Sequence, residues 1–325
     1  MAGLNQTNGN DAGNDRGQAT GFTEENGKPG LKAAMRLYLF VFVLLIIFGS
    51  LAQAAHFEIG MTITQVVIIL LPALWFLRRY RVDKRTFSRF KPLQARYIPT
   101  ILVLAAAMWI LNMALAAGLV SGLMELGYEP VQVLEAPETF LDYLIFVLVI
   151  SVFAGICEEV LFRGAIMPSM ESHGLVPAVV FSSLLFALFH VTFLNLFTTF
   201  ILGMVMAVVV IKTGSLWGGV IYHMFNNFIA ATYLYIAGQE EAATEIEPQF
   251  FLSLLPIIIA ALAAAYFSLR KLHHQSGSEP LLKDRDSWLP RGWFGGIFIV
   301  SVILFLIMAL LEFAIGFNWL DMGEF

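Results

Sequence analysis

The stretch "FLDYLIFVLVISVFAGICEEVLFRGA" (residues 140–165) decides the fold class. Residues 140–162 form an apolar run long enough to cross the roughly 30 Å hydrocarbon core of a bilayer, yet Glu158 and Glu159 lie within it and Arg163 directly follows. Charged side chains at that depth are costly, and they usually face the interior of a helix bundle with a partner. The stretch therefore predicts a membrane-spanning helix whose charged residues have partners.

The composition extends this prediction to the whole chain. Of the 325 residues, 58% are hydrophobic and only 13% are charged, whereas a soluble domain carries roughly a quarter charged residues. We therefore expect an all-α polytopic membrane protein, a bundle of eight or nine transmembrane helices, with the count open around 176–212. The apolar runs long enough to span a bilayer lie at 37–56, 62–78, 97–119, 140–162, 176–194, 196–212, 215–237, 250–269 and 293–316.

The chain divides into four predicted parts. Residues 1–32 are rich in Gly, Asn and acidic residues and lack an apolar core, so they predict a disordered cytoplasmic tail rather than a signal peptide. We expect N-terminal transmembrane helices with a basic cytoplasmic loop at 33–134. A core that holds the polar intramembrane residues follows at 135–237, and C-terminal transmembrane helices follow at 238–325. The single Cys157 cannot form an intramolecular disulfide.

Lysine and arginine residues are concentrated in two loops. Eight lie at 78–96 and five at 270–291, whereas none lies at 97–162 or 213–269, where the loops are acidic. Because the cytoplasmic loops of membrane proteins carry an excess of positive charge, the basic loops and the N-terminus are expected in the cytoplasm. The pattern is typical of an integral, multi-pass protein of the bacterial cytoplasmic membrane.

Helical geometry gives the three charged side chains of residues 140–165 different directions. Residues four apart share a helix face, so Glu159 and Arg163 are expected to form an ion pair. Glu158 is rotated by roughly 100° from Glu159, and it therefore points toward another part of the bundle.

Two histidines and an asparagine also lie within apolar runs. His190 follows Phe186 by four residues and Asn227 follows His223 by four, so each pair shares a helix face. A single intramembrane His or Asn is often no more than a hydrogen-bonding contact between helices. Several such residues that converge with a carboxylate indicate a reactive site.

An expected cytoplasmic turn at Gly174 sets the depth of these side chains. Glu158 lies 16 residues before it and His190 lies 16 residues after it, which places both roughly 24 Å along their helices if both segments are helical. In an antiparallel hairpin the two side chains are then side by side. His223 joins them if the first helix extends beyond the bilayer surface, with a kink at Pro168. Such a set offers a base to activate water and donors for an oxyanion, as hydrolysis requires.

At these residues the sequence resembles the CPBP family of intramembrane proteases, which groups CAAX prenyl endopeptidases with bacterial Abi-type relatives. The resemblance is carried by "EEVLFR" (158–163), "FALFH" (186–190) and "HMFNN" (223–227), which occur in the family's order and on apolar segments. It covers about residues 135–235, so the core predicted at 135–237 is CPBP-like.

The resemblance implies a membrane-embedded, CAAX-type endopeptidase, and we expect no cofactor. It assigns the activation of a water molecule to Glu158 and His190. It assigns the oxyanion hole to His223 and Asn227. The residues expected to support this site are Glu159, Arg163 and Phe186.

Other functions remain open for the same residues. A zinc-dependent metalloendopeptidase would use Glu158, His190 and His223 as ligands, with Glu159 as the base, because two His and one Glu are a common zinc set. We favour the metal-free mechanism, since the HExxH spacing is absent and no cysteine thiolate is placed to help. A non-catalytic immunity or scaffold membrane protein would bind its partner in the same cavity. A transporter would be expected to show internal repeats, and the sequence shows none.

The expected partners are the lipid bilayer and a peptide or membrane-protein substrate, with or without a lipid modification. No nucleic-acid partner is expected. Because bacteria generally lack CAAX prenylation, we favour an unprenylated substrate that is cut near the cytoplasmic side.

Overall fold

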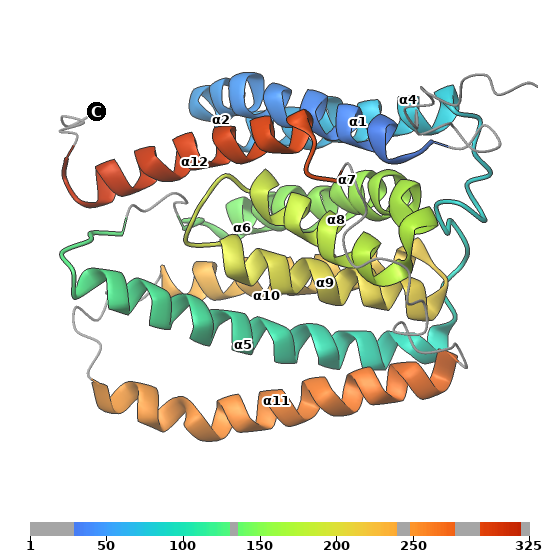
Figure 1. Ribbon diagram of the computed structural model, residues 1–325. Coiled ribbons are helices and arrows are strands. Elements are labelled where there is room, and N and C mark those ends of the chain that lie inside the picture. The colour runs from blue at the N-terminus through green and yellow to red at the C-terminus, as the bar shows by residue number, and fades with distance from the viewer. Residues whose placement is uncertain (1–28, 131–135, 239–247, 277–292, 320–325) are drawn as a thin grey trace, which may run out of the picture.

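The computed structural model describes residues 29–130, 136–238, 248–276 and 293–319. Within these residues all regular secondary structure is helical, and the helices run side by side in one bundle (Figure 1). The prediction of an all-α polytopic membrane protein is therefore confirmed. Most of the predicted tail, residues 1–28, lies outside the described residues.

Helical segments of different type follow one another without a break in several places. The π-helical segments are η2, η3, η5 and η6, and the 3₁₀ segments are η4 and η7. The first third of the chain contains α1 Leu31–Leu44, η2 Leu45–Gly49, α2 Ser50–Ala55, α3 Phe57–Ile63, η3 Thr64–Leu70, α4 Leu71–Arg79, η4 Ala95–Tyr97 and α5 Ile98–Met124. The remainder contains α6 Phe140–Phe146, η5 Val147–Phe153, α7 Ala154–Leu161, η6 Phe162–Ile166, η7 Met167–His173, α8 Leu175–Phe189, α9 Leu196–Thr213, α10 Leu216–Ala237, α11 Pro248–Ser276 and α12 Gly296–Gly316.

Seven continuous segments of the described chain are long and apolar enough to cross a membrane. The shorter apolar helix α8 and the helix α10 lie beside them, in keeping with the predicted eight or nine helices. The seven segments are Leu31–Ala55, Phe57–Arg79, Ala95–Met124, Phe140–His173, Leu196–Thr213, Ser253–Ser276 and Gly296–Gly316.

The predicted C-terminal end of the helix at 176–194 is wrong. Helix α8 stops at Phe189, because the backbone of Val191 has a φ of 51° and cannot continue a right-handed helix. A short connection then leads to α9, which begins at Leu196. The first helix of the same hairpin also departs from a uniform α-helix, since it changes to a 3₁₀ helix at Met167, beside Pro168.

The helices of the core lie in the middle of the bundle. Helices α7, α8, α9 and α10 are covered by α1, α4 and α12 on one side and by α5 and α11 on the other (Figure 1). Helix α7 packs against both η3 and α10, and α8 packs against α9 and α12. Segments from distant parts of the sequence therefore meet around α7.

Two glycines allow the close approach of α10 to α7. A Cβ atom at Gly155 would lie 2.6 Å from the Met224 side chain, and one at Gly219 would lie 2.5 Å from Oε2 of Glu159. Small residues at helix contacts let backbones approach closely inside a membrane. This approach brings the polar side chains of α10 within reach of the two glutamates of α7.

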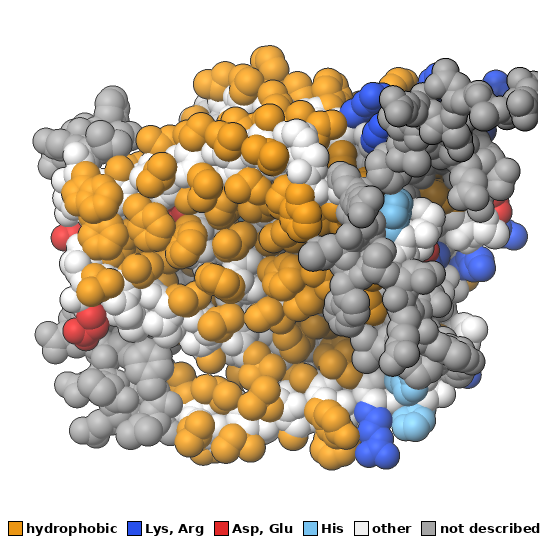
Figure 2. Space-filling model, viewed as in Figure 1, with side chains coloured by type: hydrophobic (Ala, Val, Ile, Leu, Met, Phe, Trp, Pro, Cys, Tyr) orange, Lys and Arg blue, Asp and Glu red, His pale blue; other side chains and the backbone are white. Residues whose placement is uncertain are grey.

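The surface of the bundle is apolar in its middle and charged at its ends. Large apolar residues such as Phe48, Leu262 and Leu310 are more than half exposed, as expected for a lipid-facing surface. Most of the visible Lys and Arg side chains gather at the end where α1 begins and α11 ends (Figure 2). Acidic side chains are visible at the opposite end, near the end of α5.

Candidate active site

The helix that carries the two glutamates has a well-defined start. At α6, Oγ1 of Thr139 accepts a hydrogen bond from the backbone N–H of Asp142 (3.2 Å), and the Asp142 carboxylate accepts one from the backbone N–H of Thr139 (3.1 Å). This capping box satisfies backbone donors at the helix N-terminus. The chain then continues from α6 through the π-helix η5 into α7. Short π-helical segments are frequent at functional sites.

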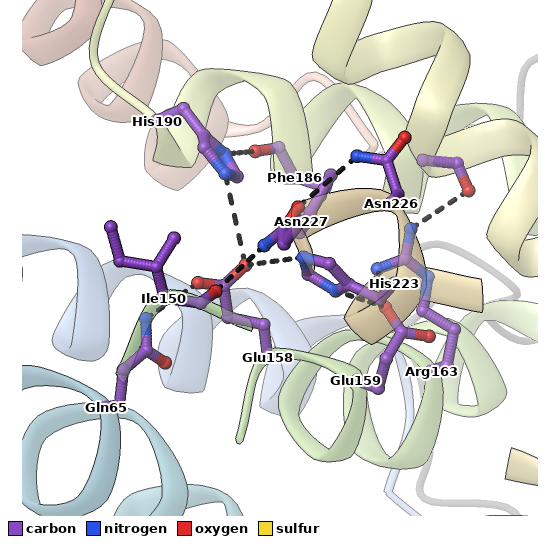
Figure 3. Close-up of polar contacts among 11 residues, drawn as sticks. Gln65, Ile150, Glu158, Glu159, Arg163, Phe186, His190, His223, Asn226 and Asn227 are labelled. Carbon is purple, nitrogen blue, oxygen red and sulfur yellow. Dashed lines mark hydrogen bonds and ion pairs between the residues drawn. The ribbon is translucent and has the colours of Figure 1, made fainter. Parts of the chain in front are cut away.

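Glu158 lies at the centre of a buried polar cluster (Figure 3). Only 6% of this residue is exposed. Its Oε1 atom accepts a hydrogen bond of 2.8 Å from Nε2 of Gln65 on η3. Its Oε2 atom lies 3.9 Å from Nε2 of His190 and 4.0 Å from Nε2 of His223. Both imidazoles therefore face the same carboxylate oxygen from different helices.

The orientation of the His190 ring follows from the end of α8. Its Nδ1 atom lies 2.8 Å from the backbone oxygen of Phe186. Because a carbonyl oxygen can only accept, Nδ1 carries the hydrogen, and Nε2 is directed at Glu158 with its lone pair in the neutral ring. The His190 side chain is 33% exposed and that of Glu158 is 8% exposed, so His190 lies on the more open side of the cluster.

His223 connects the two glutamates. Its Nδ1 atom lies 3.5 Å from Oε1 of Glu159, while its Nε2 atom faces Glu158. The fully buried Phe186 ring contacts both imidazoles edge-on, with centroid distances of 4.7 Å to His190 and 5.9 Å to His223. Phe186 therefore packs against both histidines.

Glu159 and Arg163 form the ion pair that their spacing predicts. Nη1 of Arg163 donates to Oε1 of Glu159 at 2.6 Å, and both side chains are at most 1% exposed. Nη2 of Arg163 donates to the backbone oxygen of Gly203 on α9 at 2.9 Å. The guanidinium also lies over the Phe186 ring, 4.5 Å from its centroid. The pair thus ties α7 to α9 and to the aromatic ring between the histidines.

Asn227 lies on the same face of α10 as His223 (Figure 3). Its Nδ2 atom donates to the backbone oxygen of Ile150 at 3.0 Å, and its Oδ1 atom accepts a hydrogen bond of 3.3 Å from Asn226. These contacts fix the amide against η5. Seven residues are predicted for the site, and the contacts above join six of them. The seventh, Asn227, makes no direct contact with either glutamate but lies one helical turn after His223 on α10.

Two further polar side chains belong to the cluster, and neither is singled out by the motifs. Gln65 stands in the apolar run 62–78, where an amide is unusual, and this is the signal that points to it. Asn226 is buried at 7% exposure beside Asn227. Its position in "HMFNN" gives no separate signal, because the motif already uses its neighbour.

The described residues contain no group of three or more His, Cys, Asp and Glu side chains arranged to hold a metal ion. The convergence of Glu158, His190 and His223 is the arrangement nearest to the predicted zinc set. Both imidazole nitrogens lie too far from the carboxylate oxygen for a direct hydrogen bond.

Comparison with known families agrees with this geometry. Residues 140–229 match the family described as type II CAAX prenyl endopeptidase, Rce1-like. The matched segment runs from the start of α6 into α10, and it includes Glu158, His190, His223 and Asn227. No curated protein and no solved structure matches the chain. Residues 140–229 thus match an Rce1-like domain of the type II CAAX prenyl endopeptidases, and this match is consistent with a CPBP family intramembrane protease.

Proposed function

We propose that this intramembrane endopeptidase hydrolyses a peptide bond with a water molecule activated by Glu158 and His190. The observation that carries the proposal is the buried Oε2 atom of Glu158, which faces both imidazole Nε2 atoms at 3.9 and 4.0 Å. These distances are too long for direct hydrogen bonds and suit a bridging water. Oε2 has no direct hydrogen-bond partner among the described residues.

The water is oriented by two acceptors. In neutral His190, Nδ1 donates to Phe186, so Nε2 accepts a hydrogen bond from the water. Oε2 of Glu158 accepts the second hydrogen of the same water. A lone pair of the water oxygen then points away from both acceptors, toward the carbonyl carbon of the substrate.

His223 and Asn227 provide donors for the oxyanion. Only the imidazolium form of His223 carries a hydrogen on both ring nitrogens. In that form Nε2 can donate to the oxyanion while the hydrogen on Nδ1 faces Glu159. Asn227 uses one amide hydrogen on Ile150 and retains the other for the substrate. Preorganised donors of this kind are usually the largest single contribution to acyl-transfer catalysis.

The charges of such a site balance. Two carboxylates, one guanidinium and one imidazolium sum to zero, which suits a cluster buried within apolar helices. The Arg163 charge is taken up by Glu159 at 2.6 Å, so Glu158 is left free to accept a proton. This division explains why two adjacent glutamates are needed.

The reaction then proceeds in two proton transfers. As the water oxygen bonds to the carbonyl carbon, one proton of the water passes to Glu158, and the carbonyl oxygen becomes an oxyanion. When the oxyanion collapses, the C–N bond breaks and the proton on Glu158 passes to the leaving amine. The first products are a carboxylic acid, which keeps the second proton of the water, and a neutral amine, and Glu158 is ionised again. The acid then gives that proton to the amine, which leaves a carboxylate and an ammonium group.

The substrate proposed for this site is a peptide or a membrane-protein segment, unprenylated and cut near the cytoplasmic side. The two glutamates lie on the segment Phe140–His173, which is long and apolar enough to cross a membrane, and this supports a substrate that enters from the bilayer. We also propose that the basic end of the bundle and the N-terminus face the cytoplasm of a bacterial cell, because Lys and Arg gather at that end.

The test compares the membrane proteomes of cells that express the wild-type chain or Glu158→Gln at equal levels. We expect at least one membrane peptide or protein to accumulate uncut in the variant. Glu58→Gln is the control, since this exposed glutamate on α3 lies outside the cluster. Identical proteomes for the wild type and Glu158→Gln, or full biological effect of the variant, would favour the non-catalytic immunity or scaffold function.

The zinc-dependent alternative uses the same convergence, with Glu158, His190 and His223 as ligands. It is separated from the metal-free mechanism by metal analysis of the purified protein and by chelation followed by washing. The metal-free mechanism predicts substoichiometric zinc and unchanged cleavage. Stoichiometric zinc, with activity lost on chelation and restored by zinc, would contradict it.

A further inference from the structure

Gln65 is a buried amide outside the Rce1-like domain that contacts the proposed catalytic carboxylate. It lies on η3, 93 residues before Glu158, and only 2% of it is exposed. Its Nε2 atom donates to Oε1 of Glu158 at 2.8 Å (Figure 3). The domain match begins at residue 140, so no motif of the domain assigns this contact.

The hydrogen bond determines which carboxylate oxygen is available for the reaction. Oε1 is held by Gln65, and Oε2 is the atom that faces the two histidines. The last torsion of a glutamate side chain is broad and has no strongly preferred value. Without a donor on Oε1, the carboxylate is free to rotate and to move Oε2 off the line between the imidazoles. An amide N–H can only donate, so the contact occupies a lone pair of Oε1 and leaves Oε2 for the water.

The helices that precede Gln65 are in close contact with each other. The preceding residue, Thr64, accepts a hydrogen bond of 3.1 Å from Gln53 on α2 and donates one of 2.8 Å to the backbone oxygen of Gly60. A Cβ atom at Gly60 would collide with the backbone of Ala52, so the two segments are in close contact there. Gln65 itself is part of a π-helix, a form that frequently marks functional sites.

The amide of Gln65 leaves one of its polar atoms, the buried Oε1, without a hydrogen-bond partner among the described residues. Burial of an unsatisfied polar atom is unfavourable, and an apolar side chain would avoid this cost. Local choices that reduce stability are expected at functional positions.

We propose that Gln65 is a positioning residue that orients Glu158 for the activation of water. Through this contact the N-terminal hairpin, α2 to η3, completes the active site of the domain at 140–229. The proposal rests on the proposed function for the role of Glu158, and on the hydrogen bond itself for the orientation.

The experiment compares Gln65→Met with Gln53→Met in the full-length protein, purified in detergent. Methionine retains the length and flexibility of glutamine but donates no hydrogen bond. Gln53→Met is the matched control, because it removes an amide-donated hydrogen bond to Thr64 on the same hairpin without touching Glu158. Cleavage is measured on a quenched fluorescent peptide, both unmodified and with a farnesylated C-terminal CAAX sequence. The infrared carboxylate band of Glu158 is isolated by subtracting the matching Glu158→Gln spectrum.

We expect Gln65→Met to lower kcat by about 10- to 100-fold, as for the loss of a hydrogen bond to a charged group, with little change in KM. The carboxylate band should shift in Gln65→Met and stay in place in Gln53→Met, and both variants should unfold at similar temperatures. An unshifted band in Gln65→Met, or an unchanged kcat, would overturn the proposal.

The two proposals fail in different ways. If the wild type cuts neither peptide and the band still shifts in Gln65→Met, the orientation of Glu158 by Gln65 is supported and the proposed peptidase function is contradicted for these substrates. If the wild type is active and Gln65→Met loses only thermal stability, to the same extent as Gln53→Met, the positioning role is contradicted and the peptidase function stands.

Discussion

Glu158 and Glu159 are neighbours in sequence with different surroundings. One helical step rotates a side chain by about 100°, so Glu158 faces Gln65 and the two histidines, whereas Glu159 faces Arg163. Spacing alone predicts the ion pair of Glu159 with Arg163, and the contact of 2.6 Å confirms it. Spacing also predicts that His190 lies at the same depth as Glu158, and the distance of 3.9 Å between them confirms this. Their catalytic roles stay predictions.

The ion pair between Glu159 and Arg163 is expected to contribute strongly to stability. Glu159→Gln leaves the Arg163 guanidinium buried without its counter-charge, which costs about 3–5 kcal/mol when one partner of a buried pair is removed. The unfolding temperature in detergent should fall by many degrees. Glu58→Gln is the control, since the His56 and Glu58 side chains of its pair are 59% and 40% exposed and such a pair contributes about 1 kcal/mol or less. Equal losses for the two variants would contradict a special role of the buried pair.

The end of α8 is the element that places His190. The N–H of Val191 bonds to the backbone oxygen of Leu188, and its φ of 51° is rare for a β-branched residue. Such strain persists where the surrounding structure imposes it, and it clusters at active sites. From helix α12, Oε2 of Glu312 accepts a 2.6 Å hydrogen bond from the backbone N–H of Phe193, which holds the connection after His190.

Val191→Gly is expected to separate stability from activity. Glycine adopts positive φ without strain, so the unfolding temperature should stay the same or rise. The turn after His190 becomes less restricted, and cleavage should fall several-fold. Val180→Gly is the control, because this exposed valine lies inside α8, where glycine costs about 0.5–1 kcal/mol. A variant Val191→Gly that is less stable than Val180→Gly and fully active would contradict this account.

The elements show what the sequence can and cannot predict. The apolar runs predict where the helices cross, because lipid requires long apolar segments with internal hydrogen bonds. The early end of α8 could not be predicted, since nothing in the local composition marks Val191 for a positive φ, and the contact of the following connection with Glu312 joins residues 119 apart. Gln65 was missed for a similar reason. Its partner is 93 residues away, and periodicity within one helix does not show which helix it faces.

At the scale of the whole molecule, the charges lie at two ends of an apolar bundle (Figure 2). The basic end contains the loop after α4, and the acidic end contains the loop after α5. Part of the charge pattern used for the orientation, at 239–247 and 277–292, lies outside the described residues. The division of the chain into four parts also stays a prediction.

The proposed orientation can be tested with single cysteines. Cys157 is buried, and Cys157→Ala provides a background without cysteine. In bacterial cells, Lys84→Cys in the basic loop should react with a membrane-impermeant maleimide only after permeabilisation. Glu125→Cys at the acidic end should react in intact cells. The reverse pattern would contradict the cytoplasmic placement of the basic end.

The most direct test of the account measures hydrolysis by the purified protein in phospholipid vesicles. The substrate is the peptide or protein that accumulates uncut in cells with Glu158→Gln, and the reaction is run in ¹⁸O-labelled water. The wild type should introduce one ¹⁸O atom into the new C-terminal carboxylate, and Glu158→Gln should lower the rate by about 100-fold or more without a lower unfolding temperature. Cleavage by Glu158→Gln at the wild-type rate would contradict the assignment of Glu158 as the base.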